Sequence, residues 1–104
     1  GFVTILALIR HGSTAWNEQG RMQGRRDIPL SEHGRAQVRA WRVPDELTGP
    51  GSDARWFSSP LSRAVETAEL ICGAEPARDG ALTEEGAALV RDRIGSCAVV
   101  LRRG

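Results

Sequence analysis

Two arginines and a histidine are the residues of this sequence best suited to chemistry. Arg10 and His11 directly follow an apolar run, and Arg63 comes shortly after a second run that ends at Ser58-Ser59. Guanidinium groups bind phosphate oxygens through paired hydrogen bonds, and a helix N-terminus after Ser59 would add the positive end of its dipole. These residue types in this order predict a site for a dianionic phosphate group.

A histidine between two such arginines has a specific chemical use. A neutral imidazole nitrogen can attack phosphorus in line and hold the phosphoryl group as a covalent intermediate. The arginines would disfavour protonation of His11 and spread the charge of the transferring group. The other ring nitrogen needs an acceptor, such as a backbone carbonyl, to fix the tautomer, and a general acid must protonate the leaving oxygen.

The elements that must position these residues alternate between strands and helices. Apolar runs at 2–9 and 97–101 and a short one at 55–57 are expected to be strands. This order favours a single α/β domain over residues 1–104, a layered fold with a mainly parallel sheet flanked by helices. Ligands collect at the carboxyl ends of parallel strands, where His11 lies.

Helix and loop signals complete the expected fold. Capping and stop residues predict three helices, from Ser31 to about Val43, from Ser59 to Gly73, and over 83–94. Stretches rich in Gly, Pro, Ser and Asp predict loops at 10–29, 45–53 and 74–81.

The ordered motifs of this chain resemble the histidine phosphatase superfamily, which includes the cofactor-dependent phosphoglycerate mutases and related phosphatases. The matching blocks are Arg10-His11-Gly12, Thr14-x-Trp16-Asn17, Arg21-x-Gln23-Gly24, Asp27-x-Pro29-Leu30-Ser31-Glu32-x-Gly34 and Ser58-Ser59-x-Leu61-x-Arg63-Ala64-x-x-Thr67-Ala68. The resemblance covers about residues 3–72 and implies a phosphoglycerate mutase-like fold.

The resemblance also implies a role for each matching position. His11 matches the phosphate acceptor, and Arg10 and Arg63 match the phosphate clamp. Asn17 matches a contact to the phosphoryl group. The remaining phosphate-side and substrate-side positions are Gly12, Thr14, Gln23 and Gly24. Leu82-Thr83-Glu84 resembles the segment that supplies the acidic proton donor, so Glu84 is the candidate acid; the alternative is a solvated residue in the first turn of a helix.

The end of the sequence departs from the family. The family closes its site with a second histidine in a His-Gly-like turn, whereas here Arg102-Arg103-Gly104 follow the last strand. Arg103 in that place would hold phosphate but would not titrate near pH 7. The sequence therefore resembles a family member that is truncated, internally shortened or incomplete.

Several functions remain open at this point. The leading one is a phosphomonoester hydrolase that works through a phosphohistidine on His11. A phosphoglycerate mutase-type phosphotransferase is less favoured, because Gln23-Gly24-Arg25 resembles the phosphatase branch and the chain lacks room for long insertions. The missing second histidine motivates another alternative, a catalytically impaired phosphate-binding or regulatory remnant. The last alternative is an unrelated small α/β interaction domain.

The composition limits which kinds of binding partner are expected. With 14 basic and 13 acidic residues the net charge is +1, so neither nucleic acid nor a membrane surface is expected as a partner. We expect a small phosphorylated substrate or inorganic phosphate, and a homodimer only if an uncovered sheet edge pairs. Two histidines and two cysteines without ligand spacing suggest no metal, and no cofactor is expected. A cytoplasmic location is expected, because no signal peptide precedes the first apolar run.

Three other predictions concern single residues. His33 is expected on the surface, and Trp41 and Trp56 are expected in the core rather than as stacking platforms.

Overall fold

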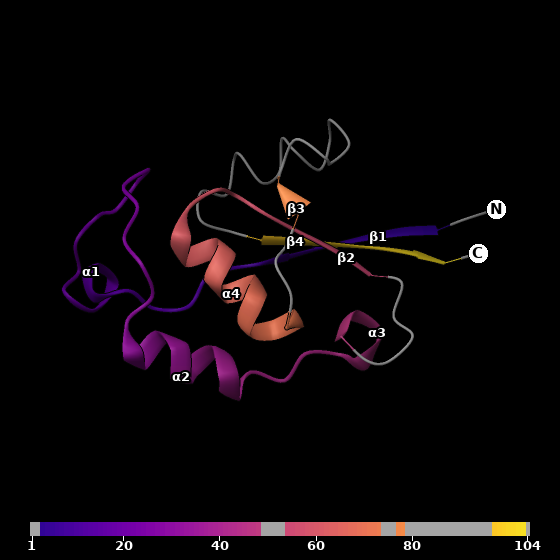
Figure 1. The fold of residues 1–104 in the computed structure, drawn as a ribbon, viewed down its shortest axis with the longest axis horizontal. Coiled ribbons are helices and arrows are strands. Elements are labelled where there is room, and N and C mark those ends of the chain that lie inside the picture. Colours follow the sequence, from indigo (N-terminus) through magenta and orange to yellow (C-terminus); the bar gives the residue numbers. More distant parts are fainter. Residues whose placement is uncertain (1–2, 49–53, 74–76, 79–96, 104) are drawn as a thin grey trace.

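The computed structural model describes residues 3–48, 54–73, 77–78 and 97–103. Helices lie between β1 and β2 and between β2 and β3 (Figure 1), which confirms the α/β class. The strands are β1 (Val3–Ile9), β2 (Arg55–Ser58), β3 (Ala77–Arg78) and β4 (Cys97–Arg103). The helices are α1 (Ala15–Glu18), α2 (Glu32–Ala40), α3 (Asp45–Thr48) and α4 (Ser62–Cys72).

The four described strands form one mixed sheet in the order β1-β4-β2-β3. Strand β4 is antiparallel to both β1 and β2, and only β2 and β3 pair in parallel. The prediction of a mainly parallel sheet is therefore wrong for these strands. A short apolar run predicts a buried strand but does not encode its direction. Because β1 and β2 are both antiparallel to β4, they run the same way and their carboxyl ends share one edge.

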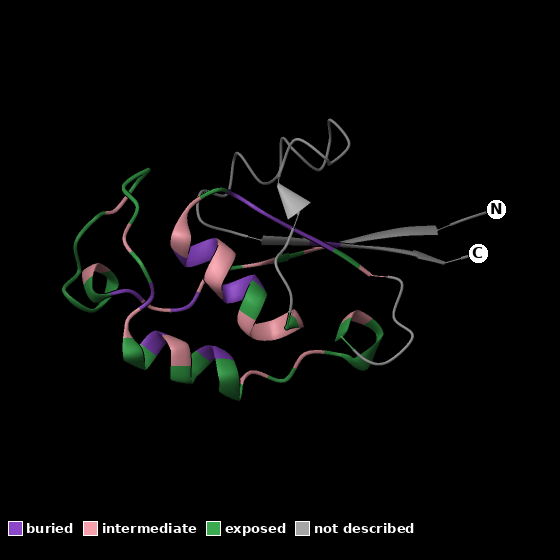
Figure 2. Ribbon diagram, in the orientation of Figure 1, coloured by how far each residue is buried: buried purple, intermediate pink, exposed green. Residues whose placement is uncertain are grey.

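Helix α4 packs directly on the sheet, against β2 and β4, and α2 packs on α4 (Figure 1). Two small residues of α4, Ala64 and Ala68, are fully buried and allow this close approach. Ala68 forms the core cluster with Trp56 and Val99, which confirms the predicted place of Trp56. Figure 2 shows buried stretches on both β2 and α4, which contact each other. Burial of a side chain such as Val99 contributes about 1.5–3 kcal/mol.

Helix ends agree with the sequence signals where those signals are local. Ser31 caps α2, accepting a 2.9 Å hydrogen bond from the Gly34 backbone N–H. Gly73 ends α4 with a φ of 75°, the left-handed conformation that favours glycine. Helix α2 stops at Ala40 rather than Val43, because Trp41 is already extended, with ψ 141°.

Three elements were not expected. Helix α1 lies in the first predicted loop because Thr14 and Asn17 form a capping box. Helix α3 lies in the second predicted loop, with Asp45 and Glu46 in its first turn, where carboxylates are favourable. Strand β3 lies in the third predicted loop and pairs with β2. The helix expected over 83–94 lies outside the described residues.

Helix α4 begins later than predicted. Its N-cap is Leu61 rather than Ser59, and Leu61 offers no side-chain hydrogen bond. No helix in the described ranges is long and apolar enough to cross a bilayer.

Candidate active site

His11 follows the carboxyl end of β1 and is held in one tautomer. Its Nδ1 atom lies 2.5 Å from the backbone carbonyl oxygen of Gly12. Since a carbonyl oxygen only accepts, Nδ1 must carry the hydrogen and Nε2 must carry the lone pair. The tautomer expected for a nucleophilic imidazole is thus the one that the local backbone selects.

The surroundings of His11 keep its imidazole neutral. Burial lowers the pKa of His11 below its ordinary value of 6.5, and the charges of Arg63 and Arg10 lower it further. The hydrogen bond to the Gly12 carbonyl acts in the opposite direction but does not outweigh them. His11 is therefore unprotonated near pH 7, with its lone pair available.

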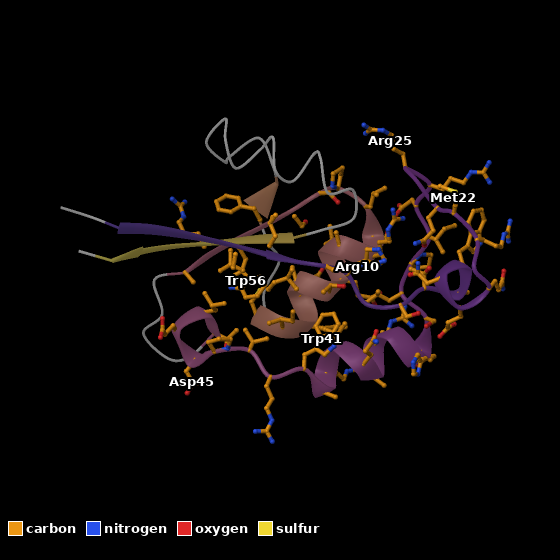
Figure 3. The ribbon with its side chains drawn as sticks, turned by 180° about the vertical axis from the view of Figure 1, so that it is seen from behind. Arg10, Met22, Arg25, Trp41, Asp45 and Trp56 are labelled. Atoms are coloured by element: carbon orange, nitrogen blue, oxygen red, sulfur yellow. The ribbon has the colours of Figure 1, made fainter. Side chains whose placement is uncertain are left out.

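A cavity of about 400 Å³ lies beside His11, and its walls also include Arg10, Asn17, Gln37 and Trp41. This volume is within the usual range for small-ligand sites, about 300–1,000 Å³. Figure 3 labels Arg10 and Trp41, which come from the end of β1 and the end of α2. Trp41 is only half-buried and borders the cavity, so the prediction that it belongs to the core is wrong.

Arg63 comes from the first turn of α4 and is almost completely buried, at 2% exposure. Its Nη1 donates to the carbonyl of Arg26 and its Nη2 to the carbonyl of Gly24, each at 2.6 Å. Its Nε is buried with no hydrogen-bond partner among the described residues. Arg63 does not border the cavity beside His11, yet its charge reaches that imidazole.

Asp27 supplies the cap that the start of α4 lacks. Its carboxylate accepts from the backbone N–H of Ser62 at 2.6 Å and from the Ser62 hydroxyl at 3.0 Å. These two hydrogen bonds lower the pKa of Asp27. The residues of the loop before α2 thus hold both the first turn of α4 and the Arg63 guanidinium. The motif contained Asp27, but sequence reasoning gave it no role.

Gly12 has no room for a side chain. A Cβ there would lie 2.6 Å from Val38 Cγ2 and 2.9 Å from the Gly34 carbonyl oxygen. Its N–H donates to Thr67 Oγ1 at 3.1 Å, and that hydroxyl donates to the carbonyl of Arg63 at 2.6 Å. Thr67 therefore links the turn after β1 to α4, a role that the sequence did not indicate.

The predicted substrate-side residues form one hydrogen-bonded group. Thr14 is fully buried and contacts the side chains of Asn17 and Gln23. Gly24 follows with a φ of 53°, and its carbonyl accepts from Arg63. Beside them the Arg21 guanidinium lies 3.7 Å from the centroid of the Trp16 ring.

The remaining predicted residues are Glu84, Arg103 and His33. Glu84 is outside the described residues, and Arg103 ends β4. His33 is exposed on α2, as expected. Within the described ranges no group of three His, Cys, Asp or Glu residues is placed to hold a metal ion.

Comparisons with known proteins place the chain in a family. The profile of the histidine phosphatase superfamily (branch 1) matches residues 6–88. Phosphoglycerate mutase-like protein 4 of Arabidopsis thaliana is 39% identical over 71 residues, 65% of this chain and 30% of that protein. The uncharacterized phosphatase PhoE of Bacillus subtilis is 42% identical over 72 residues, 66% of this chain and 34% of that protein.

Solved structures show the same relationship. The crystal structure of TTHB049 from Thermus thermophilus aligns with a TM-score of 0.54 at 40% identity, covering 71% of this chain and 40% of that one. Mycobacterial glucosyl-3-phosphoglycerate phosphatase in complex with VO3 aligns with a TM-score of 0.54 at 36% identity, covering 72% and 37%. The chain thus spans about a third of the length of the curated relatives named above. With four-fifths of its residues matched by one family profile, the chain belongs to the histidine phosphatase superfamily, branch 1.

Proposed function

We propose that this chain carries the phosphoryl-accepting part of a phosphomonoester hydrolase. The observation that supports the proposal most directly is the neutral His11 imidazole, with its lone pair on Nε2, beside a cavity that Arg10 also borders. In the proposed reaction Nε2 forms a bond to phosphorus while the bond from phosphorus to the ester oxygen breaks. The guanidinium group of Arg10, which borders the cavity, stabilises the charge on the transferring group, and the charge of buried Arg63 adds to the positive field at His11.

The second half of the proposed reaction releases phosphate. The departing alkoxide takes a proton from an acid, for which Glu84 is the candidate, and water then cleaves the phosphohistidine to inorganic phosphate and free His11. The positive charge that this chemistry requires comes from arginines, so the proposed reaction needs no metal ion. The substrate class is small phosphomonoesters.

The names of the relatives do not decide between a phosphatase and a mutase. PhoE of Bacillus subtilis and the mycobacterial protein are named phosphatases, whereas other relatives are named phosphoglycerate mutases. The stretch Gln23-Gly24-Arg25 favours the phosphatase branch here. A second candidate is a phosphate-binding chain without turnover. One observation favours it: Arg63 donates both terminal nitrogens to loop carbonyls and does not border the cavity beside His11.

Labelling with a generic phosphomonoester carrying ³²P tests the proposal. We expect acid-labile, base-stable label on the wild-type chain and none on His11→Ala, whereas the matched control His33→Ala labels normally. Release of inorganic phosphate identifies a hydrolase, and transfer of label to a second alcohol identifies a mutase. Phosphate binding by a folded chain that never labels would establish the binding-only candidate and overturn the enzyme.

A further inference from the structure

We propose that Thr14 is a positioning residue that fixes the Asn17 and Gln23 carboxamides, so that the NH₂ group of Asn17 is free to donate to a phosphoryl group bound in the cavity beside His11. This inference rests on the proposed function, because it names what orients the polar side of the same site. Thr14 itself is fully buried, so contact between its side chain and a ligand is excluded. Its influence must pass through the two side chains that it binds.

The orientation of Asn17 follows from a backbone donor. The Thr14 N–H donates to Oδ1 of Asn17 at 3.0 Å. Because an N–H cannot accept, the atom facing it must be the amide oxygen, and the NH₂ group must point the other way. Asn17 borders the cavity with Arg10 and His11, so its side chain can present this donor to an anion there. The part of the chain that the structure describes offers Nδ2 no partner of its own.

The orientation of Gln23 follows from a distance. Thr14 Oγ1 lies 2.6 Å from Oε1 of Gln23 and 3.2 Å from Oδ1 of Asn17. A hydroxyl has one hydrogen, and 2.6 Å is within the usual range of O–H···O bonds, about 2.5–3.0 Å, whereas 3.2 Å is longer. The hydrogen therefore goes to Gln23, which must receive it on oxygen and keep both N–H groups free. The hydroxyl also accepts from the Asn17 backbone N–H at 3.1 Å.

Thr14 thus fixes two amide side chains that come from different segments. Asn17 is held by the Thr14 backbone N–H and by the hydroxyl that caps α1, and Gln23 is held by the same hydroxyl. Without the Thr14 hydroxyl, α1 would lose its side-chain cap and Gln23 would lose its partner, so the Asn17 amide at the cavity would be held less firmly. An inverted amide would present a carbonyl oxygen to a phosphate oxygen and repel it.

Three variants test the proposal in the full chain, with inorganic phosphate as the probe in calorimetric titrations. Thr14→Val keeps the shape and removes the hydroxyl, and we expect it to weaken phosphate binding at least about tenfold. Thr14→Ser restores the hydroxyl, and we expect binding within about threefold of wild type. The matched control Thr48→Val, at an exposed threonine of α3, should bind as wild type does.

A double variant separates positioning from general structural damage. If Thr14 acts partly through Asn17, its removal should weaken binding by a smaller factor in an Asn17→Ala background than in wild type. Equal factors in both backgrounds, with normal unfolding curves, would overturn the proposal, and so would wild-type affinity in Thr14→Val.

Nuclear magnetic resonance of the ligand-free chain separates this proposal from the proposed function. We expect the side-chain NH₂ groups of Asn17 and Gln23 to be rigid in wild type and Thr14→Ser and mobile in Thr14→Val. Rigid amides in a wild-type chain that binds no phosphate would support the positioning role and overturn the proposed function. Equal mobility in all three chains would overturn the positioning role, whatever the chain binds.

Discussion

The carboxylate of Asp27 caps a helix that begins 35 residues later, by accepting both the backbone N–H and the hydroxyl of Ser62. The same loop offers the carbonyls of Gly24 and Arg26 to the Arg63 guanidinium. The loop and the first turn of α4 therefore form a reciprocal contact. Stability of the helix start and placement of the phosphate-side arginine depend on the same few residues.

Replacing Asp27 by Asn should reduce stability in a pH-dependent way. Loss of a helix cap costs about 0.5–2 kcal/mol, and Asn keeps part of the cap, so we expect a loss near the low end of this range at pH 7. The folded pKa of Asp27 is lowered, so its charge contributes fully above the ordinary value of 3.8 and progressively less as pH falls through the lowered value. Urea unfolding of both chains from pH 6 to pH 2.5 measures this.

The difference between wild type and Asp27→Asn should therefore shrink below about pH 4. An equal change at an exposed carboxylate of α3, Asp45→Asn, serves as the control for a general charge effect. A difference that stays constant down to pH 2.5 would contradict the capping role.

Local sequence signals predicted the parts of the fold that local interactions determine. The start of α2 at Ser31 and the end of α4 at Gly73 each depend on residues within one turn. The start of α4 was predicted wrongly, because Asp27 supplies its cap from a distant loop. The prediction of a mainly parallel sheet is wrong for β4, because an apolar run can pair with its neighbours in either the parallel or the antiparallel direction.

In the candidate site, too, features set by neighbouring residues could be predicted and features set by distant segments could not. The tautomer of His11 was predictable because nucleophilic chemistry requires it and the adjacent Gly12 carbonyl provides it. The two carbonyl contacts of Arg63 were not predictable, since they depend on how a loop nearly 40 residues away folds. Trp41 was placed in the core from its helical spacing, but α2 ends just before it, which leaves it beside the cavity.

Removing the Thr67 hydroxyl should destabilise the turn that carries His11. In Thr67→Val the Gly12 N–H loses its side-chain acceptor in a buried position, which costs about 1–3 kcal/mol. Thr67→Ser keeps the hydroxyl and should lose less. Denaturant unfolding measures both, and a Thr67→Val chain as stable as Thr67→Ser would show that the hydrogen bond contributes nothing.

Gly34→Ala should be destabilising although alanine is the better helix former. A Cβ at Gly34 would lie 1.9 Å from the Ser13 carbonyl oxygen, so α2 must move away from the turn after His11. Overpacking of this kind costs about 1–3 kcal/mol or more, which exceeds the gain of about 1 kcal/mol in helix propensity. Thermal unfolding should show a lower midpoint.

Gly20→Ala is the matched control for Gly34→Ala. Gly20 has a φ of 71° and open space around it, so the substitution there introduces backbone strain without a clash. We expect a smaller loss of stability than at Gly34. A Gly34→Ala chain that is more stable than wild type would contradict the close contact between α2 and Ser13.

The imidazole of His11 should titrate below its ordinary value of 6.5, because burial and two neighbouring arginines disfavour its charged form. Nuclear magnetic resonance titration of the His33→Gln chain, which leaves one histidine signal, measures this. Arg10→Gln removes one positive charge and should raise the pKa of His11, whereas Arg42→Gln should not. Because the unfolded chain binds the proton more readily, stability should fall as pH drops below about 6.5, and this slope should disappear in His11→Gln. A midpoint at or above 6.5 would contradict the effect of burial and of the two arginines on the pKa of His11.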